Sequence, residues 1–362
     1  MAFGRSAMED LGVNREFWDG RRVLLTGHSG FKGSWLTLWL NRLGAHVTGI
    51  GLAPSTEPNL FGLARVEEQC DSHFCDIRDA AELAGLIRKA RPEVVFHLAA
   101  QPLVRAGYAQ PIETFATNIM GTAHVLEPLR NLADVRVAVM VTTDKVYRNR
   151  EWTRPYREDD AIGGRDPYSA SKAAGEIVIS CYRDSWLRTQ GVAVASARAG
   201  NVIGGGDWSK DRLIPDAVRA WGADDVLQVR RPDAVRPWQH VLEPLAAYLA
   251  LAEVLWKQPA LADAYNFGPD TDAAATTKEV VEVARRSYGK GEVTYATTTE
   301  GPHEAGLLIL ETGKARAQLG VSPKWSLTEA VRRTMAWYRA REQGADAREL
   351  CLREVADYEL LL

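Results

Sequence analysis

The chain has few cysteines and none of the spacings that cysteine-rich scaffolds or zinc sites use. Its 362 residues include four cysteines, and no two of them form a C-x-x-C pair. A disulfide framework is therefore excluded for a chain of this length. Cys70, His73 and Cys75 lie close together, but they lack paired ligands at zinc-site spacing, so a buried strand is favoured over a metal site. We expect no metal.

Long apolar runs and an excess of positive charge are also missing. No apolar stretch reaches the roughly 18 residues that a membrane-spanning helix needs. Residues 1–20 contain acids and no apolar run, which argues against a secretory signal. The net charge of −3 leaves no broad basic field for nucleic acid. We therefore expect a cytoplasmic protein that binds neither membranes nor nucleic acid.

What the sequence does contain is an alternation of strand-like and helix-like segments. Continuous apolar runs are typical of strands that are covered on both faces, so the alternation predicts an α/β fold with a Rossmann-type, doubly wound parallel sheet. The predicted strands lie at 22–27, 46–52, 93–99, 137–143 and 192–200, and the predicted helices at 34–43, 114–132 and 168–188.

A G-x-x-G-x-x-G turn follows the first predicted strand and opens the first predicted helix. Glycines let the backbone turn tightly and approach a diphosphate, and the helix N-terminus offers free N–H groups to an anion. The alternative is a turn that merely lets helix and strand pack. We predict dinucleotide binding by Gly27, His28, Gly30, Phe31, Lys32 and Gly33.

The end of the second strand bears on the choice of cofactor. Residues 49–52 include neither an acid for a ribose diol nor an arginine for a 2′-phosphate, which favours NAD over NADP. Asp76 and Ile77, which close the third strand, are candidates for contact with the adenine, although Asp76 could equally be a solvent-facing turn residue.

Beyond about residue 200 the regular alternation of strand-like and helix-like segments ends. Residues 230–240 are too rich in proline and arginine for a regular element. Helices are predicted at 241–257, 277–288 and 326–340, with a short strand near 265–267. We therefore predict an NAD-binding domain of residues 1–200 with 240–267 returning to it, and a smaller C-terminal α/β substrate-binding domain of 201–239 and 268–362.

A Y-x-x-x-K pair begins the helix predicted at 168–188. Tyr168 and Lys172 are four residues apart, so they share one helix face. A nearby ammonium lowers the pKa of a phenol and lets it act as a base. Thr143, at the end of a predicted strand, can bind the same substrate oxygen. The alternative is an exposed helix face, but the preceding glycine turn favours a catalytic group of Thr143, Tyr168 and Lys172.

Together these segments resemble the sugar-nucleotide 4,6-dehydratases of the extended short-chain dehydrogenase/reductase family. The resemblance runs from about Trp18 to about residue 340. It is carried by segments 26–36, 95–105, 117–122, 142–147, 166–172, 198–208, 236–244, 265–269 and 302–305.

Positions 144 and 145 separate the branches of that family. The branch that acts on dTDP-glucose carries Asp–Glu there, as the acid and base of water elimination, whereas the CDP-glucose branch carries Asp–Lys. This chain has Asp144–Lys145 and so resembles the CDP-glucose branch. Val146 departs from the cysteine expected in close relatives, but it need not touch the sugar.

The resemblance implies a mechanism. Tyr168 removes the C4 hydroxyl proton as NAD takes a hydride, Lys145 removes the C5 proton, Asp144 protonates the departing C6 hydroxyl, and the hydride returns to C6. Asp144 must then be protonated and Lys145 neutral, and burial favours both neutral forms. The alternative is a simple ion pair, in which both groups are charged.

The resemblance also implies further contacts and partners. A sugar-nucleotide epimerase or a non-catalytic NAD-sensing regulator remains the alternative function. The helices near 111–132 and 168–188 are expected to pair in a homodimer or a tetramer. Cofactor contacts are expected from Ala99, Ala100, Gln101 and Asn118, and substrate contacts from Arg105, Arg198, Asn201, Arg212, Arg236 and His303. Trp208 and Trp238 either form walls against the base or sugar or simply pack in the lid.

Overall fold

The computed structural model describes residues 13–297 and 305–362, and it is built around one seven-stranded sheet. The strand order is β11-β6-β5-β4-β1-β2-β3, and every neighbouring pair is parallel. This confirms the predicted Rossmann-type sheet. The strands are β1 (Arg22–Thr26), β2 (His46–Gly51), β3 (Asp71–Phe74), β4 (Val94–His97), β5 (Val137–Val141), β6 (Ala193–Ala199) and β11 (Ala264–Phe267).

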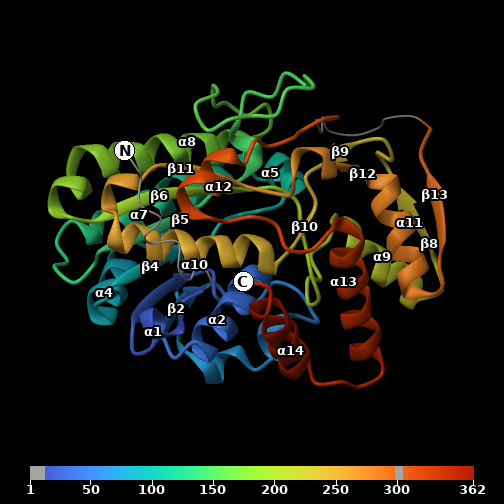
Figure 1. The fold of residues 1–362 in the computed structure, drawn as a ribbon, viewed down its shortest axis with the longest axis horizontal. Coiled ribbons are helices and arrows are strands. Elements are labelled where there is room, and N and C mark those ends of the chain that lie inside the picture. Colours follow the sequence, from blue (N-terminus) through green and yellow to red (C-terminus); the bar gives the residue numbers. More distant parts are fainter. Residues whose placement is uncertain (1–12, 298–304) are drawn as a thin grey trace, which may run out of the picture.

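Helices cover both faces of this sheet (Figure 1). Val23 and Leu25 of β1 belong to one core with α2 (Phe31–Arg42) and α10 (Leu242–Lys257). Leu24, between them, points to the other face and joins the core formed with three helices. Such alternation is the period-two pattern of a strand buried on both sides. The three helices are α4 (Ala80–Ala90), α7 (Gly121–Leu129) and α8 (Pro167–Tyr182).

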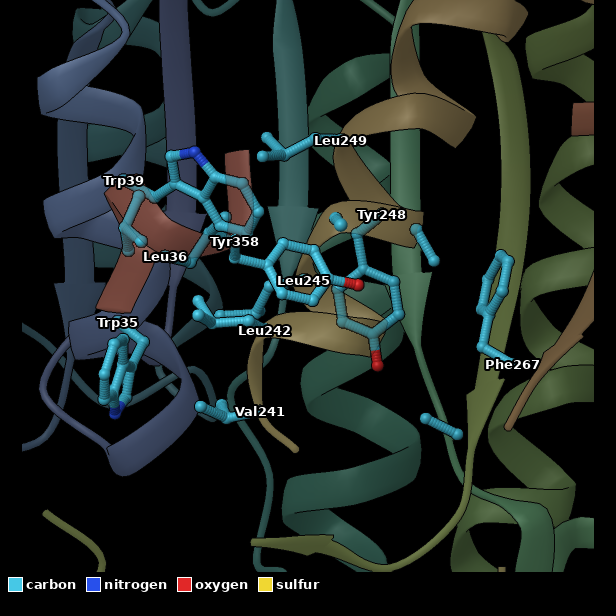
Figure 2. Close-up of a cluster of buried hydrophobic side chains, with 14 of the residues drawn as sticks. Trp35, Leu36, Trp39, Val241, Leu242, Leu245, Tyr248, Leu249, Phe267 and Tyr358 are labelled. Carbon is cyan, nitrogen blue, oxygen red and sulfur yellow. The ribbon is translucent and has the colours of Figure 1, made fainter. Parts of the chain in front are cut away.

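Two tryptophans of α2 form the centre of the larger core. Figure 2 shows Trp35 and Trp39 beside Leu242 and Leu245 of α10, and all four side chains are almost completely buried. Burying one such side chain stabilises a fold by about 1.5–3 kcal/mol. The cluster therefore fixes α2, and with it the glycine turn at its N-terminus, against the sheet.

The C-terminal helix α14 (Ala347–Glu359) packs against α2, on the nucleotide-binding half of the molecule. Trp39 Nε1 donates to Glu359 Oε1 at 2.9 Å, and the Tyr358 hydroxyl donates to Glu243 at 2.6 Å. The expected substrate-binding domain includes the whole of 268–362. Helix α14 instead crosses back, because its buried face finds its partners on α2 and α10.

Some predicted boundaries shift for local reasons. The strand predicted at 137–143 ends at Val141, although Thr142 N still donates to the Ala197 carbonyl of β6 at 2.9 Å, and a 3-10 turn follows at Asp144–Val146. The helix predicted at 114–132 begins earlier, with α6 (Pro111–Phe115), and passes through a π-helical turn into α7. The prediction of no regular element in 230–240 was wrong, since this segment contains the two-residue strands β9 (Val235–Arg236) and β10 (Gln239–His240).

The remaining elements are short sheets and helices, most of them after β6. Strands β13 (Glu292–Tyr295) and β8 (Val226–Val229) pair in parallel, β10 pairs with β7 (Val202–Ile203), and β12 (Ala275–Thr276) pairs with β9. No helix within the described residues has the length and apolar character needed to cross a membrane. The other helices are α1 (Arg15–Trp18), α3 (Leu60–Leu63), α5 (Val104–Ala109), α9 (Leu213–Gly222), α11 (Thr277–Tyr288), α12 (Gly313–Leu319) and α13 (Leu327–Glu342).

Candidate active site

A cavity of about 800 Å³ opens at the carboxyl ends of the parallel strands. Its floor comes from the loops that follow β1, β2, β4, β5 and β6, which is where doubly wound sheets bind ligands. Its other wall comes from the second half of the chain, including Trp208, Arg230, Trp238 and Leu308. The cavity therefore lies between the nucleotide-binding sheet and the later elements.

The glycine turn at the start of α2 is packed too tightly for side chains at two of its glycines. A Cβ on Gly33 would lie 2.0 Å from the carbonyl oxygen of Gly27, and a Cβ on Gly27 would lie 2.7 Å from the backbone nitrogen of Ala99. Gly27 also has a φ of +79°, a backbone conformation that favours glycine. Both glycines are thus required for the turn that places the N-terminus of α2 at the cavity.

Gly33→Ala is therefore expected to weaken NAD binding by roughly 5- to 150-fold, since overpacking against backbone costs about 1–3 kcal/mol. Calorimetric titration with NAD measures this loss. Gly85→Ala in α4 is the matched control, because no heavy atom lies within 4 Å of its added Cβ. Equal NAD affinity in the two variants would contradict the assignment of this turn.

His28 does not reach the cavity, contrary to the sequence-based prediction. Its ring is fully buried, shares a hydrogen bond with Ser72 Oγ at 2.7 Å and fills the space that Gly49 leaves at β2. Burial lowers the pKa of this imidazole to about 4. The ring can turn toward the sheet only because Gly49 has no side chain, since a Cβ there would lie 2.4 Å from the His28 ring.

The other predicted cofactor residues divide between the cavity wall and the layer behind it. Asn118 lies behind the wall, where its Oδ1 accepts from Gln101 N at 2.8 Å and its Nδ2 donates to Ser171 Oγ at 2.8 Å. Asp76 is held by Arg78, whose hydrogen bonds keep the pKa of that carboxyl below its usual value. The wall itself includes Gly27, Gly30, Phe31, Lys32, Gly33, Asp76, Ile77, Ala99, Ala100 and Gln101.

Lys32 is a buried amine inside the cavity. Its Nζ donates to the Tyr248 hydroxyl at 3.2 Å, and burial together with the nearby charges of Arg212 and Lys172 lowers its pKa to about 7. A lysine with this environment can carry or lose a proton near neutral pH. Lys32 thus adds a titratable group beside the reacting side chains.

Tyr168 and Lys172 both line the cavity on the first turns of α8. Asp166 caps this helix by accepting from Ser169 N at 2.9 Å, which places Tyr168 in the first turn. The Tyr168 hydroxyl is hydrogen-bonded to Thr143. The predicted Thr–Tyr–Lys group is therefore gathered at one place.

The electrostatics of this group differ from the expectation. Burial raises the pKa of Tyr168 to about 12, although the hydrogen bond with Thr143 opposes the rise. Burial also lowers the pKa of Lys172 to about 8, and its Nζ donates to the Val141 carbonyl at 3.0 Å. The predicted lowering of the phenol's pKa by Lys172 is not found: the hydrogen bond with Thr143 and the charge of Arg212 lower this pKa, and the removal of the phenolate from water outweighs both.

Asp144 and Lys145 form the turn that follows β5. Lys145 Nζ lies 3.3 Å from Asp144 Oδ1, which also accepts from Thr143 Oγ1 at 2.9 Å. Asp144 is fully buried behind the cavity wall, and its Oδ2 has no hydrogen-bond partner among the described residues. Lys145 lines the cavity with 29% of its side chain exposed, so the burial expected for this amine is absent and the geometry is that of an ion pair.

Three predicted arginines and one asparagine line the cavity. Arg105, Asn201, Arg212 and Arg236 all do so. Arg212 Nη1 donates to Asp207 Oδ2 at 2.9 Å, and Asn201 Oδ1 is buried without a hydrogen-bond partner among the described residues. The arginines offer donors to an anionic ligand, and Asn201 offers an acceptor to a hydroxyl group.

Arg198 is different and does not line the cavity. It lies on β6 with 5% of its side chain exposed, and it makes paired hydrogen bonds of 2.9 and 3.0 Å to Glu176. The predicted pyrophosphate contact from Arg198 is therefore not supported, because its guanidinium is committed to a buried carboxylate. His303 lies outside the described residues.

Two further residues at or beside the site are not among those expected from the sequence. Arg230 lines the cavity and donates to Asp211 Oδ1 at 3.0 Å, within the segment expected to be irregular. Glu176 was also missed, although it stands four residues after Lys172, the same spacing that drew attention to Tyr168 and Lys172. That repeated spacing was the available signal.

A Rossmann-type sheet whose glycine turn and Tyr–Lys pair face one cavity is the architecture of a dinucleotide-binding enzyme. The model of the family described as GDP-mannose 4,6 dehydratase matches residues 24–334, and the chain belongs to that family. The sequence-based resemblance to sugar-nucleotide 4,6-dehydratases is confirmed.

Similar proteins include several named sugar-nucleotide 4,6-dehydratases. The chain is 45% identical over 352 residues to the CDP-glucose 4,6-dehydratase of Salmonella typhimurium, covering 96% of this chain and 98% of the relative. It is 26% identical to the dTDP-glucose 4,6-dehydratase of Shigella flexneri, covering 88% and 93% of the two chains. A dTDP-glucose 4,6-dehydratase from Bacillus anthracis, solved in complex with NAD, shares the fold with a TM-score of 0.75, 22% identity and coverage of 90% and 98%.

Proposed function

We propose that the chain removes water from CDP-glucose to give CDP-4-keto-6-deoxyglucose. The observation that carries the proposal is the Asp144–Lys145 turn, whose lysine enters the same cavity as Tyr168 and Lys172. It is supported by the 45% identity, over 96% of the chain, with a protein of that named activity. NAD, when bound, accepts a hydride from the sugar and returns it.

The side chains divide the proton transfers. Tyr168, hydrogen-bonded to Thr143, takes the C4 hydroxyl proton, and the ammonium of Lys172 stabilises the charge that develops on the phenol. Lys145 reaches the cavity and takes the C5 proton, which the 4-keto group has made acidic. Asp144 lies behind it, and a proton passes from the Lys145 ammonium to Asp144 across their 3.3 Å contact, which leaves Lys145 neutral as the base and Asp144 protonated as the acid that supplies the departing C6 hydroxyl.

The nucleotide half of the substrate is assigned to the arginine-lined wall. Arg105, Arg212 and Arg236 present guanidinium groups, whose planar geometry suits phosphate oxygens. Asn201 places an unpaired amide oxygen at the same wall, where it can accept a hydrogen bond from a sugar hydroxyl. The arginines would hold the diphosphate while the hexose lies against Tyr168.

A panel of CDP-, dTDP-, UDP- and GDP-glucose, each incubated with the protein and NAD, tests the proposal. We expect the CDP sugar to lose the mass of one water and give a 4-keto-6-deoxy product. Epimerases share this fold, as the UDP-glucose-4-epimerase of Stenotrophomonas maltophila does with a TM-score of 0.77. A product of unchanged mass and inverted configuration at C4 would favour that alternative.

We also propose a homodimer formed through the helices beside the active site. Ile112 of α6, Met120 of the adjoining π-helical turn and Ile177 of α8 are exposed by 79%, 51% and 60%, and these elements pack against one another. Large apolar side chains gathered on an exposed surface mark an association site. The surface and the cavity share helix α8, so pairing would brace the catalytic helix.

Light scattering is expected to give twice the chain mass of 39.9 kDa, and Ile177→Glu is expected to shift it toward one chain mass. Leu360→Glu is the control, since Leu360 is 85% exposed at the end of the chain and far from these helices in sequence. A wild-type protein that stays monomeric at micromolar concentration would refute the dimer.

A further inference from the structure

A buried ion pair joins helix α8 to strand β6 directly behind the active site. Arg198 Nε and Nη2 donate to the two oxygens of Glu176 at 2.9 and 3.0 Å, and each side chain is only 5% exposed. The same carboxylate accepts from Thr142 Oγ1 at 2.6 Å and from Ser196 Oγ at 2.7 Å. Four donors thus satisfy both oxygens, which is the condition for a buried charge to be tolerated.

Glu176 of this pair connects helix α8 to the turn after β5, which carries Asp144 and Lys145. Lys172 on α8 bonds the carbonyl of Val141, and Glu176, one turn later, bonds the hydroxyl of Thr142. Successive turns of the helix therefore hold successive residues at the end of β5. The next residues in the chain are Thr143, Asp144 and Lys145, so their place relative to Tyr168 depends on these two bonds.

The carboxylate also balances the charge around Lys172. The charge of Lys172 acts on Lys32 of α2 and on His97 of β4, lowering the pKa of each, and burial keeps the imidazole of His97 neutral by lowering its pKa to about 3. Tyr168, in the first turn of α8, is neutral because its pKa is about 12. Glu176 is the carboxylate that acts on the amine, and it raises the pKa of Lys172 against the larger lowering by burial.

We infer that the Glu176–Arg198 pair is a positioning element of the reaction, which sets the acid–base turn against Tyr168 and keeps Lys172 in its ammonium form. The inference rests on the proposed function, because it assigns Lys172 a charged role during C4 oxidation. Arg198 acts through Glu176 and not on the substrate, whose cavity it does not reach. A pair that only stabilised the fold would leave the pH profile of the enzyme unchanged.

The charge is tested with the double variant Glu176→Gln/Arg198→Met, which removes both buried charges together and leaves no lone ion. Without the carboxylate, the pKa of Lys172 falls further, so the ammonium is lost at a lower pH. We expect the alkaline limb of the kcat profile to move down by about one pH unit, with KM for the sugar nucleotide changed less than twofold. An alkaline limb at its original pH overturns the inference.

The position is tested with single variants that keep both charges. Thr142→Val removes the bond to the acid–base turn, whereas Ser196→Ala removes an equivalent bond on β6. We expect kcat to fall at least fivefold further in Thr142→Val than in Ser196→Ala, with both variants folded by circular dichroism. Equal rates would overturn the positioning role. If the unmodified protein fails to dehydrate the sugar, the proposed function itself fails, which is a separate outcome.

Discussion

Tyr168→Phe is expected to lower kcat by about 10³-fold while leaving NAD affinity and fold intact. The variant removes only the hydroxyl, and loss of a general base costs about 10²–10⁴-fold in rate. The ring keeps its buried place at the start of α8, because phenylalanine fills nearly the same volume. Thr143 would remain, but its hydroxyl cannot replace a base that an adjacent ammonium supports.

Single-turnover measurement of 4-keto sugar formation checks this expectation. Tyr182→Phe is the matched control, because Tyr182 lies at the far end of the same helix and packs on Trp186. Its kcat should stay within twofold of the unmodified enzyme. Retention of more than a tenth of the activity by Tyr168→Phe would mean that another group takes the proton.

Lys145→Ala is expected to leave C4 oxidation in place and to abolish exchange of the C5 proton with solvent. Oxidation needs only the Tyr168 group, whereas elimination needs a base that reaches the cavity, as Lys145 does. Product formation should fall by about 10²–10⁴-fold, and reduced cofactor should accumulate. Deuterium incorporation at C5 in D₂O, followed by mass spectrometry, measures the exchange step directly.

A second substitution separates the base from the ion-pair alternative. Lys145→Arg keeps a positive charge beside Asp144, but a guanidinium does not lose its proton in proteins. If Lys145 is the base, the arginine variant stays as inactive as the alanine variant. Rescue by arginine would show that only the charge matters, and Lys257→Ala at the exposed end of α10 controls for a general loss of charge.

Those parts of the fold that depend on local pattern could be predicted from the sequence. Buried parallel strands are continuous apolar runs, and a glycine turn between a strand and a helix has few other uses, so the sheet and the turn at Gly27–Gly33 were predictable. Helix α14 was not predicted, although its capping Asp346 accepts from Glu349 N. Its partners on α2 are about 300 residues away in sequence, and only the folded core brings them together.

The candidate site was predicted less completely because burial decides what polar residues do. Arg198 follows an apolar run and is as plausible a phosphate ligand as Arg212, until the structure places Glu176 beside it. His28 stands within the glycine turn, but the missing side chain at Gly49 admits its ring to the interior. The raised pKa of Tyr168 has the same origin, since spacing along a helix shows which groups are close but not how dry their surroundings are.

Transfer of a label from C4 to C6 is the most direct test of the central claim, which is that one cavity oxidises, dehydrates and reduces the same sugar. CDP-glucose carrying deuterium at C4 would be incubated with the protein and NAD, and the product examined by NMR and mass spectrometry. We predict a 4-keto-6-deoxy sugar with the deuterium at C6 and the mass of one water lost. Recovery of the deuterium at C4 of an intact hexose, with that centre inverted, would contradict the account.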